Sequence, residues 1–485
     1  MLKKYHCVDK FMIRVPAFPV NALKKISDFG ADDSTKNFLN TLGNYEDYFL
    51  QSLYISSKSL YESVTSNKCD IRKNHNAMVA LQKYFIRNCV RPTPFGLCSG
   101  VALGNFADKT DMCLDPEKYN LDVTVDFAWL LNIIAKMEND KNILNQLKIK
   151  WNKNCFVSGD RIKNPCFSGH GVEGRENLAF QEVNLKRTKL IDLIRKFSDY
   201  WIPYYKLTNL IQESYPSVPR GKIEDVLKSL LDNELLLTEL RIPAYCADPL
   251  KHIFSIVEHK DVQIGYKEEL IAIENILKKY RERPNLNLCK EIYSSMERLY
   301  PCKNYIEVNR GHFFRSASLS YQIKDKLESF AEFLSEVAVM PEEYSELNDF
   351  REKFIEEYGL GIEVPIFDVI DQNKFDGLHY ISPAPIRSER EDKIRQIVDK
   401  KILFTILESK DEVKLSRTDF SGLENKNIES YSTSFDLNFY ITFDKQSHKH
   451  SIVVGPNVGA AKSGMMFQRF KNVFNVEQFA EYNQC

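Results

Sequence analysis

The chain has 485 residues, of which 43% are hydrophobic and 27% are charged, and its formal net charge is −1. A chain of this length can bury more than one core, so we expect roughly two to four structural units. The near-zero net charge excludes a protein whose whole surface attracts nucleic acid, so any RNA contact must use a local patch. The eleven cysteines are scattered without a C-x-x-C pair, which predicts reduced thiols rather than a disulfide framework.

The sequence shows no targeting segment, membrane span or metal motif. No apolar run follows Met1–His6 as in a signal peptide, and none approaches the roughly 20 residues of a membrane span. We therefore expect a cytoplasmic protein, and peripheral contact with a membrane surface stays open. His448 and His450 lack a third ligand at a fitting spacing, so no metal site is expected.

The first predicted unit, residues 1–146, mixes strands and helices. Alternating apolar residues predict strands at Phe11–Val15 and Val101–Phe106. Helical spacing of apolar residues predicts helices at Tyr45–Ser63, Asn74–Cys89 and Phe127–Lys136.

The end of the second of these helices gathers side chains with a clear chemical use. Arg87 and Arg91 are four residues apart and share one helix face, and Pro92 ends the helix. The Thr93 hydroxyl follows at once. Arginine forks suit phosphate or carboxylate, so the spacing is compatible with an anion site. A plain capped helix end with both arginines in water stays open as the alternative.

The second predicted unit covers residues 147–245. Strands are predicted at Leu147–Trp151, Cys155–Ser158, Leu178–Val183 and Leu235–Leu240, with the first two forming a hairpin around Asn152–Asn154. Helices are predicted at Lys189–Asp199, Leu207–Glu213 and Gly221–Asn233. This make-up is typical of a small winged-helix unit.

The third predicted part, residues 246–485, is rich in helices and then in strands. Helices are predicted at Tyr266–Arg281, Leu288–Leu299, Tyr321–Ser335 and Asp349–Glu357, before a loop at 376–388. Strands are predicted at Phe435–Phe443 and Ser451–Val454. The fold class is therefore α+β, in several units with the winged-helix unit embedded.

The stretch from Arg87 to Gly104 has an unusual literal pattern, Arg-x-x-x-Arg-x-Thr-Pro-Phe-Gly-Leu-x-Ser-Gly-Val-x-Leu-Gly. This pattern resembles the signature of the class I lanthipeptide (lantibiotic) dehydratases, in the N-terminal part of their glutamylation domain. Further pieces similar to the family pattern follow its order along the chain, at Phe11–Pro16, Val125–Leu130, Glu357–Gly359 with Val364–Val369, and Gln468–Phe470. The resemblance covers essentially all of the chain.

The resemblance implies a reaction and a set of partners. The hydroxyl of a Ser or Thr in a ribosomal precursor peptide would take the glutamyl group from glutamyl-tRNA, which is a co-substrate, and no cofactor is implied. A separate elimination domain would then expel glutamate to leave dehydroalanine or dehydrobutyrine. The winged-helix unit would bind the leader segment of the peptide as an added strand. The remaining dehydratase portion or an elimination protein is a further expected partner, and a homodimer and a cyclase are others.

Six residues fall on family positions that the resemblance links to glutamyl transfer. It implies a catalytic set of Arg87, Arg91, Thr93 and Asp126, and substrate or tRNA binding by Arg14 and Arg469. The arginines would bind phosphate or carboxylate, and Thr93 would support them as a hydrogen-bond donor. Asp126 would orient an arginine or assist proton transfer, but it also precedes an apolar helix and would serve equally as its N-cap.

The chain also departs from the family pattern. Asn309 stands where the family carries an aspartate, and an amide cannot act as a base or pair with a cation as a carboxylate does. Gln468 replaces the glycine before Arg469. The family's glutamylation domain continues well past the Arg-Phe motif, so we expect an incomplete domain without elimination chemistry. Two alternatives follow: a non-catalytic leader-binding scaffold or remnant, and an enzyme that joins an amino acid from a tRNA to a peptide end.

Overall fold

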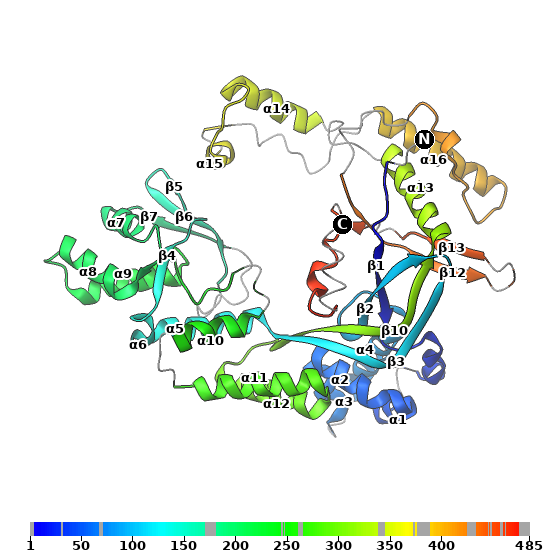
Figure 1. The fold of residues 1–485 in the computed structure, drawn as a ribbon, viewed down its shortest axis with the longest axis horizontal. Coiled ribbons are helices and arrows are strands. Elements are labelled where there is room, and N and C mark those ends of the chain that lie inside the picture. Colours follow the sequence, from blue (N-terminus) through cyan, green and yellow to red (C-terminus); the bar gives the residue numbers. More distant parts are fainter. Residues whose placement is uncertain are drawn as a thin grey trace.

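The computed structural model describes all residues except 1–3, 31–32, 67–70, 170–180, 244–245, 247, 260–264, 338–344, 372–373, 376–388, 424–432, 445, 447–448, 456–458, 461 and 475–485. Helices and strands occur together throughout the described part of the chain, as the α+β prediction requires (Figure 1). The loop predicted at 376–388 lies outside the described residues. Within the described residues, no helix is both long and apolar enough to cross a membrane.

A four-stranded sheet organises the first unit, in the order β1-β2-β10-β3 (Figure 1). Its strands are β1 (Lys10–Pro16), β2 (Gly96–Ala107), β10 (Ile306–Ser320) and β3 (Asp111–Val125). β1 pairs with β2 antiparallel, while β10 runs parallel to β2 and antiparallel to β3. A strand about 200 residues further along the chain is thus inserted between two consecutive strands.

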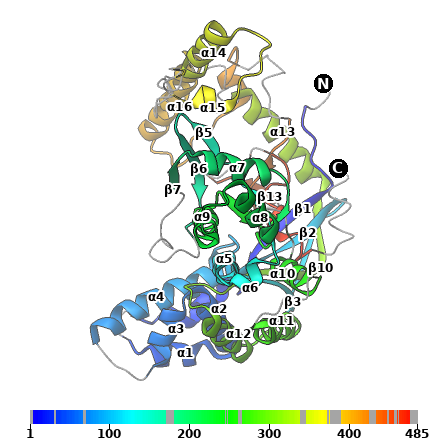
Figure 2. The ribbon, with the colours of Figure 1, turned by 90° about the vertical axis from the view of Figure 1, so that its left-hand side faces the viewer.

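Helices cover one face of this sheet (Figures 1 and 2). This helical layer consists of η1 (Val20–Ile26), α1 (Thr35–Leu42), η2 (Gly43–Tyr45), α2 (Glu46–Ser56), α3 (Lys58–Thr65), α4 (Ile71–Val90), α11 (Lys267–Glu282) and α12 (Leu286–Leu299). The helices α5 (Phe127–Asn139) and α6 (Lys141–Leu144) follow β3 and lead toward β4 (Figure 1). Strand residues such as Leu97, Val123 and Val308 share one core with buried helix residues such as Phe49 and Phe85. The single helix predicted at Tyr45–Ser63 is wrong, because the backbone is extended at Ser57 and two helices result.

Two glycines of the unusual sequence pattern allow close strand approach. A Cβ atom at Gly100 would lie 2.8 Å from both the Arg310 carbonyl oxygen and the His312 ring. A Cβ atom at Gly104 would lie 2.6 Å from the Phe11 ring. Side chains at these two positions would push the neighbouring strands away from β2, so part of the pattern is needed by the fold itself.

The C-terminal segment covers the opposite face of the sheet. It contains η7 (Gln468–Phe470), and Phe467, Phe470, Val473 and Phe474 form a small buried cluster with Val101 of β2. The Asn120 side-chain amide of β3 donates a hydrogen bond to the Val473 carbonyl oxygen over 2.8 Å. The sheet is therefore buried on both faces by segments that are far apart in the sequence.

Residues 147–245 contain two three-stranded sheets, β8-β4-β9 and β5-β6-β7, together with three helices. The strands are β4 (Lys148–Trp151), β5 (Phe156–Ser158), β6 (Arg161–Phe167), β7 (Gln181–Lys186), β8 (Ile202–Pro203) and β9 (Leu236–Thr238). The helices α7 (Lys189–Phe197), α8 (Tyr204–Ser214) and α9 (Arg220–Asp232) confirm the three that the sequence predicts. Part of the strand predicted at Leu178–Val183 lies outside the described residues, and the described strand there is β7.

The predicted hairpin around Asn152–Asn154 is wrong. β4 pairs with β8 and β9, whereas β5 pairs with β6, a strand that the sequence analysis missed. The reason lies in Asn152, whose side chain accepts a hydrogen bond from the Asn154 N–H (3.1 Å) and donates one to the Glu234 carbonyl oxygen (2.8 Å). The turn therefore connects two sheets instead of two strands of one sheet.

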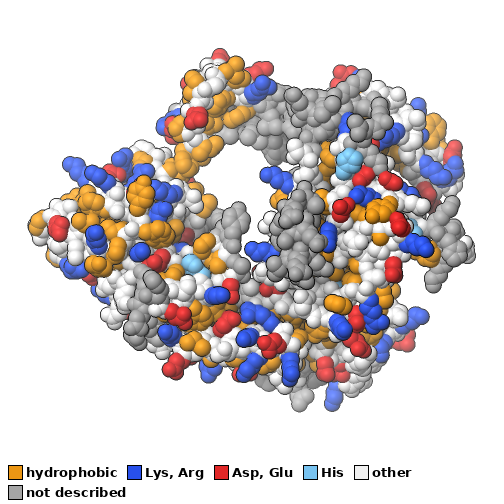
Figure 3. Space-filling model, in the orientation of Figure 1, with side chains coloured by type: hydrophobic (Ala, Val, Ile, Leu, Met, Phe, Trp, Pro, Cys, Tyr) orange, Lys and Arg blue, Asp and Glu red, His pale blue; other side chains and the backbone are white. Residues whose placement is uncertain are grey.

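The remaining elements follow β9 along the chain. They are α10 (Pro249–His259), α13 (Tyr321–Val337), α14 (Ser345–Tyr358), α15 (Ile366–Ile370), α16 (Glu389–Leu407), η5 (Arg417–Phe420), β11 (Asp436–Leu437), β12 (Tyr440–Asp444), β13 (Lys449–Val453) and β14 (Gly459–Ala460). β12 and β13 form an antiparallel hairpin, and β13 confirms the strand predicted at Ser451–Val454. The single strand predicted at Phe435–Phe443 is wrong, because that range divides into β11, which pairs with β14, and β12. On the face shown in Figure 3, basic and acidic side chains are interspersed.

Candidate functional site

Arg14 lies on the sheet face that the C-terminal segment covers. It is opposite Val101 in the β1–β2 register, and its Nη2 atom contacts the Met466 sulfur at 3.4 Å. Burial lowers the pKa of Arg14, while the nearby charges of Asp436 and Tyr440 act in the opposite direction. Arg14 is thus a half-buried cation beside an acidic side chain, and it suits a carboxylate or phosphate ligand.

Arg469 lies on the same face and comes from η7. Its Nε–H donates a hydrogen bond to the Asn309 Oδ1 atom over 3.1 Å, and its Nη2 atom pairs with Glu307 Oε1 at 3.1 Å. Half of the Arg469 side chain remains exposed. The structure therefore brings two of the predicted binding arginines, Arg14 and Arg469, onto one face of the sheet.

Arg87, Arg91 and Thr93 lie together at the end of α4. The Arg87 guanidinium stacks over the Phe95 ring, 4.5 Å from its centroid. The Arg87 Nε atom is buried and has no hydrogen-bond partner among the described residues. A buried hydrogen-bond donor without an acceptor costs free energy of folding. An anion beside this guanidinium would accept the hydrogen bond and lower that cost. Arg91 and Thr93 are exposed.

Backbone hydrogen bonds join this helix end to the strand that carries Arg14. The Phe18 N–H donates to the Asn88 carbonyl oxygen, and the Ala17 N–H donates to Cys98, both over 2.9 Å. The Ser99 hydroxyl donates to the Thr93 carbonyl oxygen over 2.7 Å. Hydrogen bonds therefore join the end of α4, the end of β1 and the start of β2 into one corner. Among the described residues, no hydrogen bond or ion pair links the arginines of this corner to Arg14 or Arg469.

Asp126 occupies the N-cap of α5. Its Oδ1 atom accepts hydrogen bonds from the Ala128 N–H (2.9 Å) and the Trp129 N–H (3.3 Å), which satisfies two of the free donors at a helix start. These contacts fit the capping alternative that the sequence left open. The catalytic assignment of Asp126 stays a prediction.

The sequence analysis missed a buried pair of basic side chains on the helix-covered face. Arg310 lies between the rings of Tyr48 and Tyr119, 4.8 and 4.6 Å from their centroids, and its Nη1 atom donates to the Tyr48 hydroxyl over 2.5 Å. Burial lowers the pKa of the adjacent His312 to about 4, and the Arg310 charge adds to this effect. The sequence carried a signal for this pair, because Arg310 and His312 are two residues apart and alternate residues of a strand share one face.

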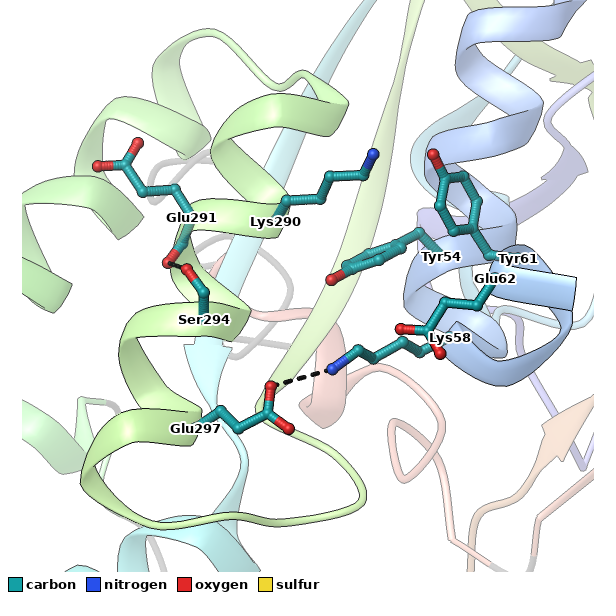
Figure 4. Close-up of a pocket in the computed structure, with 8 residues that line it drawn as sticks. All are labelled: Tyr54, Lys58, Tyr61, Glu62, Lys290, Glu291, Ser294 and Glu297. Atoms are coloured by element: carbon teal, nitrogen blue, oxygen red, sulfur yellow. Dashed lines mark hydrogen bonds and ion pairs between the residues drawn. The ribbon is translucent and has the colours of Figure 1, made fainter. Parts of the chain in front are cut away.

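A pocket also lies away from the sheet, between α2–α3 and α12 (Figure 4). Lys58 is paired with Glu297 across it at 3.1 Å, and Lys290 lies over the Tyr61 ring. The predicted site residues lie elsewhere. Among the described residues, no group of three or more His, Cys, Asp or Glu could hold a metal ion, and His448 lies outside them.

Known lantibiotic biosynthesis proteins are similar to this chain over most of its length. The family model described as "Lantibiotic dehydratase, N terminus" matches residues 46–484. The chain is similar to the subtilin biosynthesis protein SpaB of Bacillus subtilis, with 24% identity over 98% of this chain and 46% of that protein. It is also similar to the nisin biosynthesis protein NisB of Lactococcus lactis subsp. lactis, with 24% identity over 87% of this chain and 43% of that protein.

A solved structure shows the same fold. The crystal structure of the tRNA-dependent lantibiotic dehydratase MibB from Microbispora sp. 107891 matches with a TM-score of 0.76 and 19% identity, over 99% of this chain and 46% of that chain. The present chain thus spans less than half the length of these relatives.

Proposed function

The chain belongs to the lantibiotic dehydratase family as an N-terminal portion, and from this premise we propose that it takes part in glutamyl-tRNA-dependent glutamylation of a precursor peptide. The acceptor would be a Ser or Thr hydroxyl of a ribosomal peptide in lanthipeptide biosynthesis. The observation that carries the proposal is the hydrogen-bonded corner of α4, β1 and β2. It presents Arg91 and Thr93 to solvent beside Arg87, whose buried Nε–H lacks a partner among the described residues.

The proposed chemistry is an acyl transfer. The peptide hydroxyl oxygen forms a bond to the glutamyl carbonyl carbon, the bond from that carbon to the ribose oxygen of the tRNA breaks, and the hydroxyl proton ends on the ribose oxygen. The ester is already activated, so positioning and electrostatic stabilisation can lower much of the barrier. The donor's acceptor-end phosphates and glutamyl carboxylate need cations, which favours arginine.

We assign each predicted residue to one of these needs. Arg87 and Arg91 bind phosphate or carboxylate at the corner, and Thr93 supports them as a hydrogen-bond donor. Arg14 and Arg469 contact the donor from the covered face of the sheet. Asp126 orients an arginine or assists proton transfer, and it also caps the start of α5.

Residues 147–245 are proposed as the leader-binding unit. Strands β5 and β7 are the outer strands of their described sheet, and an edge strand offers backbone groups to which an extended peptide can add. The elimination of glutamate belongs, in this proposal, to a remaining dehydratase portion or a separate elimination protein. A second copy of the chain and a cyclase are further candidate partners. The boundaries 1–146, 147–245 and 246–485 remain our proposed division.

A non-catalytic leader-binding scaffold is the second candidate. Asn309 favours it, because its amide replaces a carboxylate of the family pattern. Under this alternative, the 147–245 unit binds peptide while the arginines have no tRNA ligand.

The two candidates differ in a transfer assay. The chain is incubated with a matching precursor peptide and labelled glutamyl-tRNA, alone and with the remaining dehydratase portion. We expect glutamyl ester on Ser or Thr, detected by mass spectrometry. The variant Arg87→Ala/Arg91→Ala should lose at least about 100-fold in transfer, because two charge-assisted contacts are removed, and it should still bind the leader peptide.

A matched control is Arg298→Ala, which removes an exposed arginine at the end of α12 and should leave transfer unchanged. Peptide binding without any tRNA binding or transfer would contradict the proposal and support the scaffold. Label found as an amide at the peptide end would instead indicate aminoacyl ligation.

A further inference from the structure

A line of polar side chains crosses the covered face of the sheet. Asp122 of β3 lies directly opposite Asn309 of β10 in the strand register. The Asn309 Oδ1 atom accepts the hydrogen bond of the Arg469 Nε–H over 3.1 Å. The nearby Asn309 and Asn472 side chains both stabilise the Asp122 carboxylate and oppose the rise of its pKa, and the Asn472 Nδ2 atom donates a hydrogen bond to Asp122 Oδ2 over 3.5 Å. The order across the face is carboxylate, amide, guanidinium.

The orientation of the Asn309 side-chain amide decides whether Asn309 can accept the hydrogen bond from Arg469. A side-chain amide has one acceptor end and one donor end. Because Arg469 only donates, the oxygen of Asn309 must face it, and the NH₂ group must then point away from it. An ionised carboxylate only accepts, so Asp122 favours this orientation. A reversed amide would set its NH₂ group against the guanidinium, where two donors repel each other.

Because Asn309 is buried, a wrong orientation of its amide would leave polar groups without hydrogen-bond partners. Asn309 is only 6% exposed, so water cannot readily replace a lost partner, and an unmet buried amide is costly. The second partner of Arg469, Glu307, has a half-exposed side chain, and exposed ion pairs hold a geometry weakly. Burial also raises the pKa of Asp122, which is the expected effect when a carboxylate is partly removed from water.

We propose that Asp122 is a positioning residue for Arg469: its carboxylate fixes the Asn309 amide so that the amide oxygen holds the guanidinium toward the bound donor. The carboxylate that the family pattern carries at position 309 is thereby supplied one strand away, and the amide connects it to the arginine. This inference deepens the proposed glutamyl transfer and rests on it for its activity readout.

The test is an exchange of the two side chains. Asp122→Asn removes the carboxylate and should lower kcat/KM for glutamyl-tRNA at least about 10-fold. The double variant Asp122→Asn/Asn309→Asp places the carboxylate directly against Arg469 and should return kcat/KM to within about 3-fold of the original. Asn309→Asp alone sets two carboxylates opposite each other, which is destabilising. Asp111→Asn, an exposed position of the same strand, is the matched control and should change nothing.

A second readout does not depend on transfer. The side-chain Nε–H signal of Arg469 in NMR spectra, assigned with Arg469→Lys, reports the hydrogen bond directly. Its hydrogen exchange should accelerate at least about 10-fold in Asp122→Asn and recover in the double variant. If the chain shows no transfer, the proposed function fails and this signal alone decides the positioning role. An unchanged Arg469 signal in Asp122→Asn, or a double variant no better than the single one in a folded protein, would overturn the inference.

Discussion

Single residues show that the central sheet tolerates buried charge only with specific neighbours. Arg310 is 4% exposed and is held by two tyrosine rings and one hydroxyl. His312, two residues on, has its Nε2 atom 3.0 Å from the Val15 carbonyl oxygen. A cation over aromatic faces is stabilised by the ring quadrupoles, which favours the Arg310 guanidinium at this buried position. Its charge disfavours a second cation at His312.

His312 predicts a loss of stability in mild acid. Burial and the Arg310 charge lower its pKa to about 4, whereas an unfolded histidine has a pKa near 6.5. The unfolded state therefore binds the proton first, and the free energy of unfolding falls as pH falls from about 6.5 to about 4. By linkage the loss between pH 7 and pH 5 is about 2 kcal/mol. Urea unfolding followed by circular dichroism at both pH values measures it.

The comparison variant is His312→Asn, in which this pH-dependent loss should shrink. His6→Asn changes an exposed side chain and should keep the full loss. A His312→Asn protein with the same acid sensitivity as the original would show that another group carries the effect.

Individual elements follow local chemistry closely where their caps are visible in the sequence. Thr188 caps α7 and Asn285 caps α12 through side-chain hydrogen bonds to backbone N–H groups, and both helices lie where apolar spacing predicts them. Asp126 does the same for α5. Asp126 is also the residue whose role differs most between the capping and catalytic interpretations.

The cap gives a prediction about Asp126 itself. Asp126→Ala should lower the free energy of unfolding by about 1 kcal/mol, because two N–H donors at the start of α5 lose their partner. Asp126→Asn should be nearly neutral, since Asn caps as well as Asp. Urea unfolding of both variants tests this, with Asp111→Ala in β3 as an exposed control. If Asp126→Asn keeps its stability but loses glutamyl transfer, Asp126 acts in catalysis as well.

At the scale of the whole molecule, the central sheet depends on segments that are distant in sequence. β10 separates β2 from β3, and the segment around η7 covers the face that carries Arg14 (Figure 1). The C-terminal segment therefore has two roles, burial of apolar strand residues and presentation of Arg469.

This arrangement predicts a long-range effect of Phe470→Ala. Phe470 is 4% exposed and packs in the cluster that includes Val101. Its truncation should cost about 3 kcal/mol of stability, and hydrogen exchange should accelerate in β1 and β2. Thermal unfolding and amide exchange measure the two effects. Tyr200→Ala, at a side chain that is 80% exposed, should change stability by less than about 0.5 kcal/mol, and equal effects of both variants would contradict the packing role.

The sequence by itself determined the α+β class, the family resemblance and most of the helices. It did so because helix formation is local: apolar spacing, caps and prolines within one segment predict α4, α5, α7 and α12. The pattern from Arg87 to Gly104 also predicted that two arginines and a threonine gather at the end of α4, because their spacing alone sets that neighbourhood.

Only the tertiary structure decided which strands pair and what surrounds each charged side chain. Strand pairing is non-local, so the sequence around β4 does not predict that β8 and β9 are its partners. The sequence around β2 likewise does not predict its pairing with β10. The same holds for Asp122, Asn309 and Arg469, which lie on three segments separated by well over 100 residues. Their side chains come together only because β10 enters the sheet beside β3 and the C-terminal segment folds back over both.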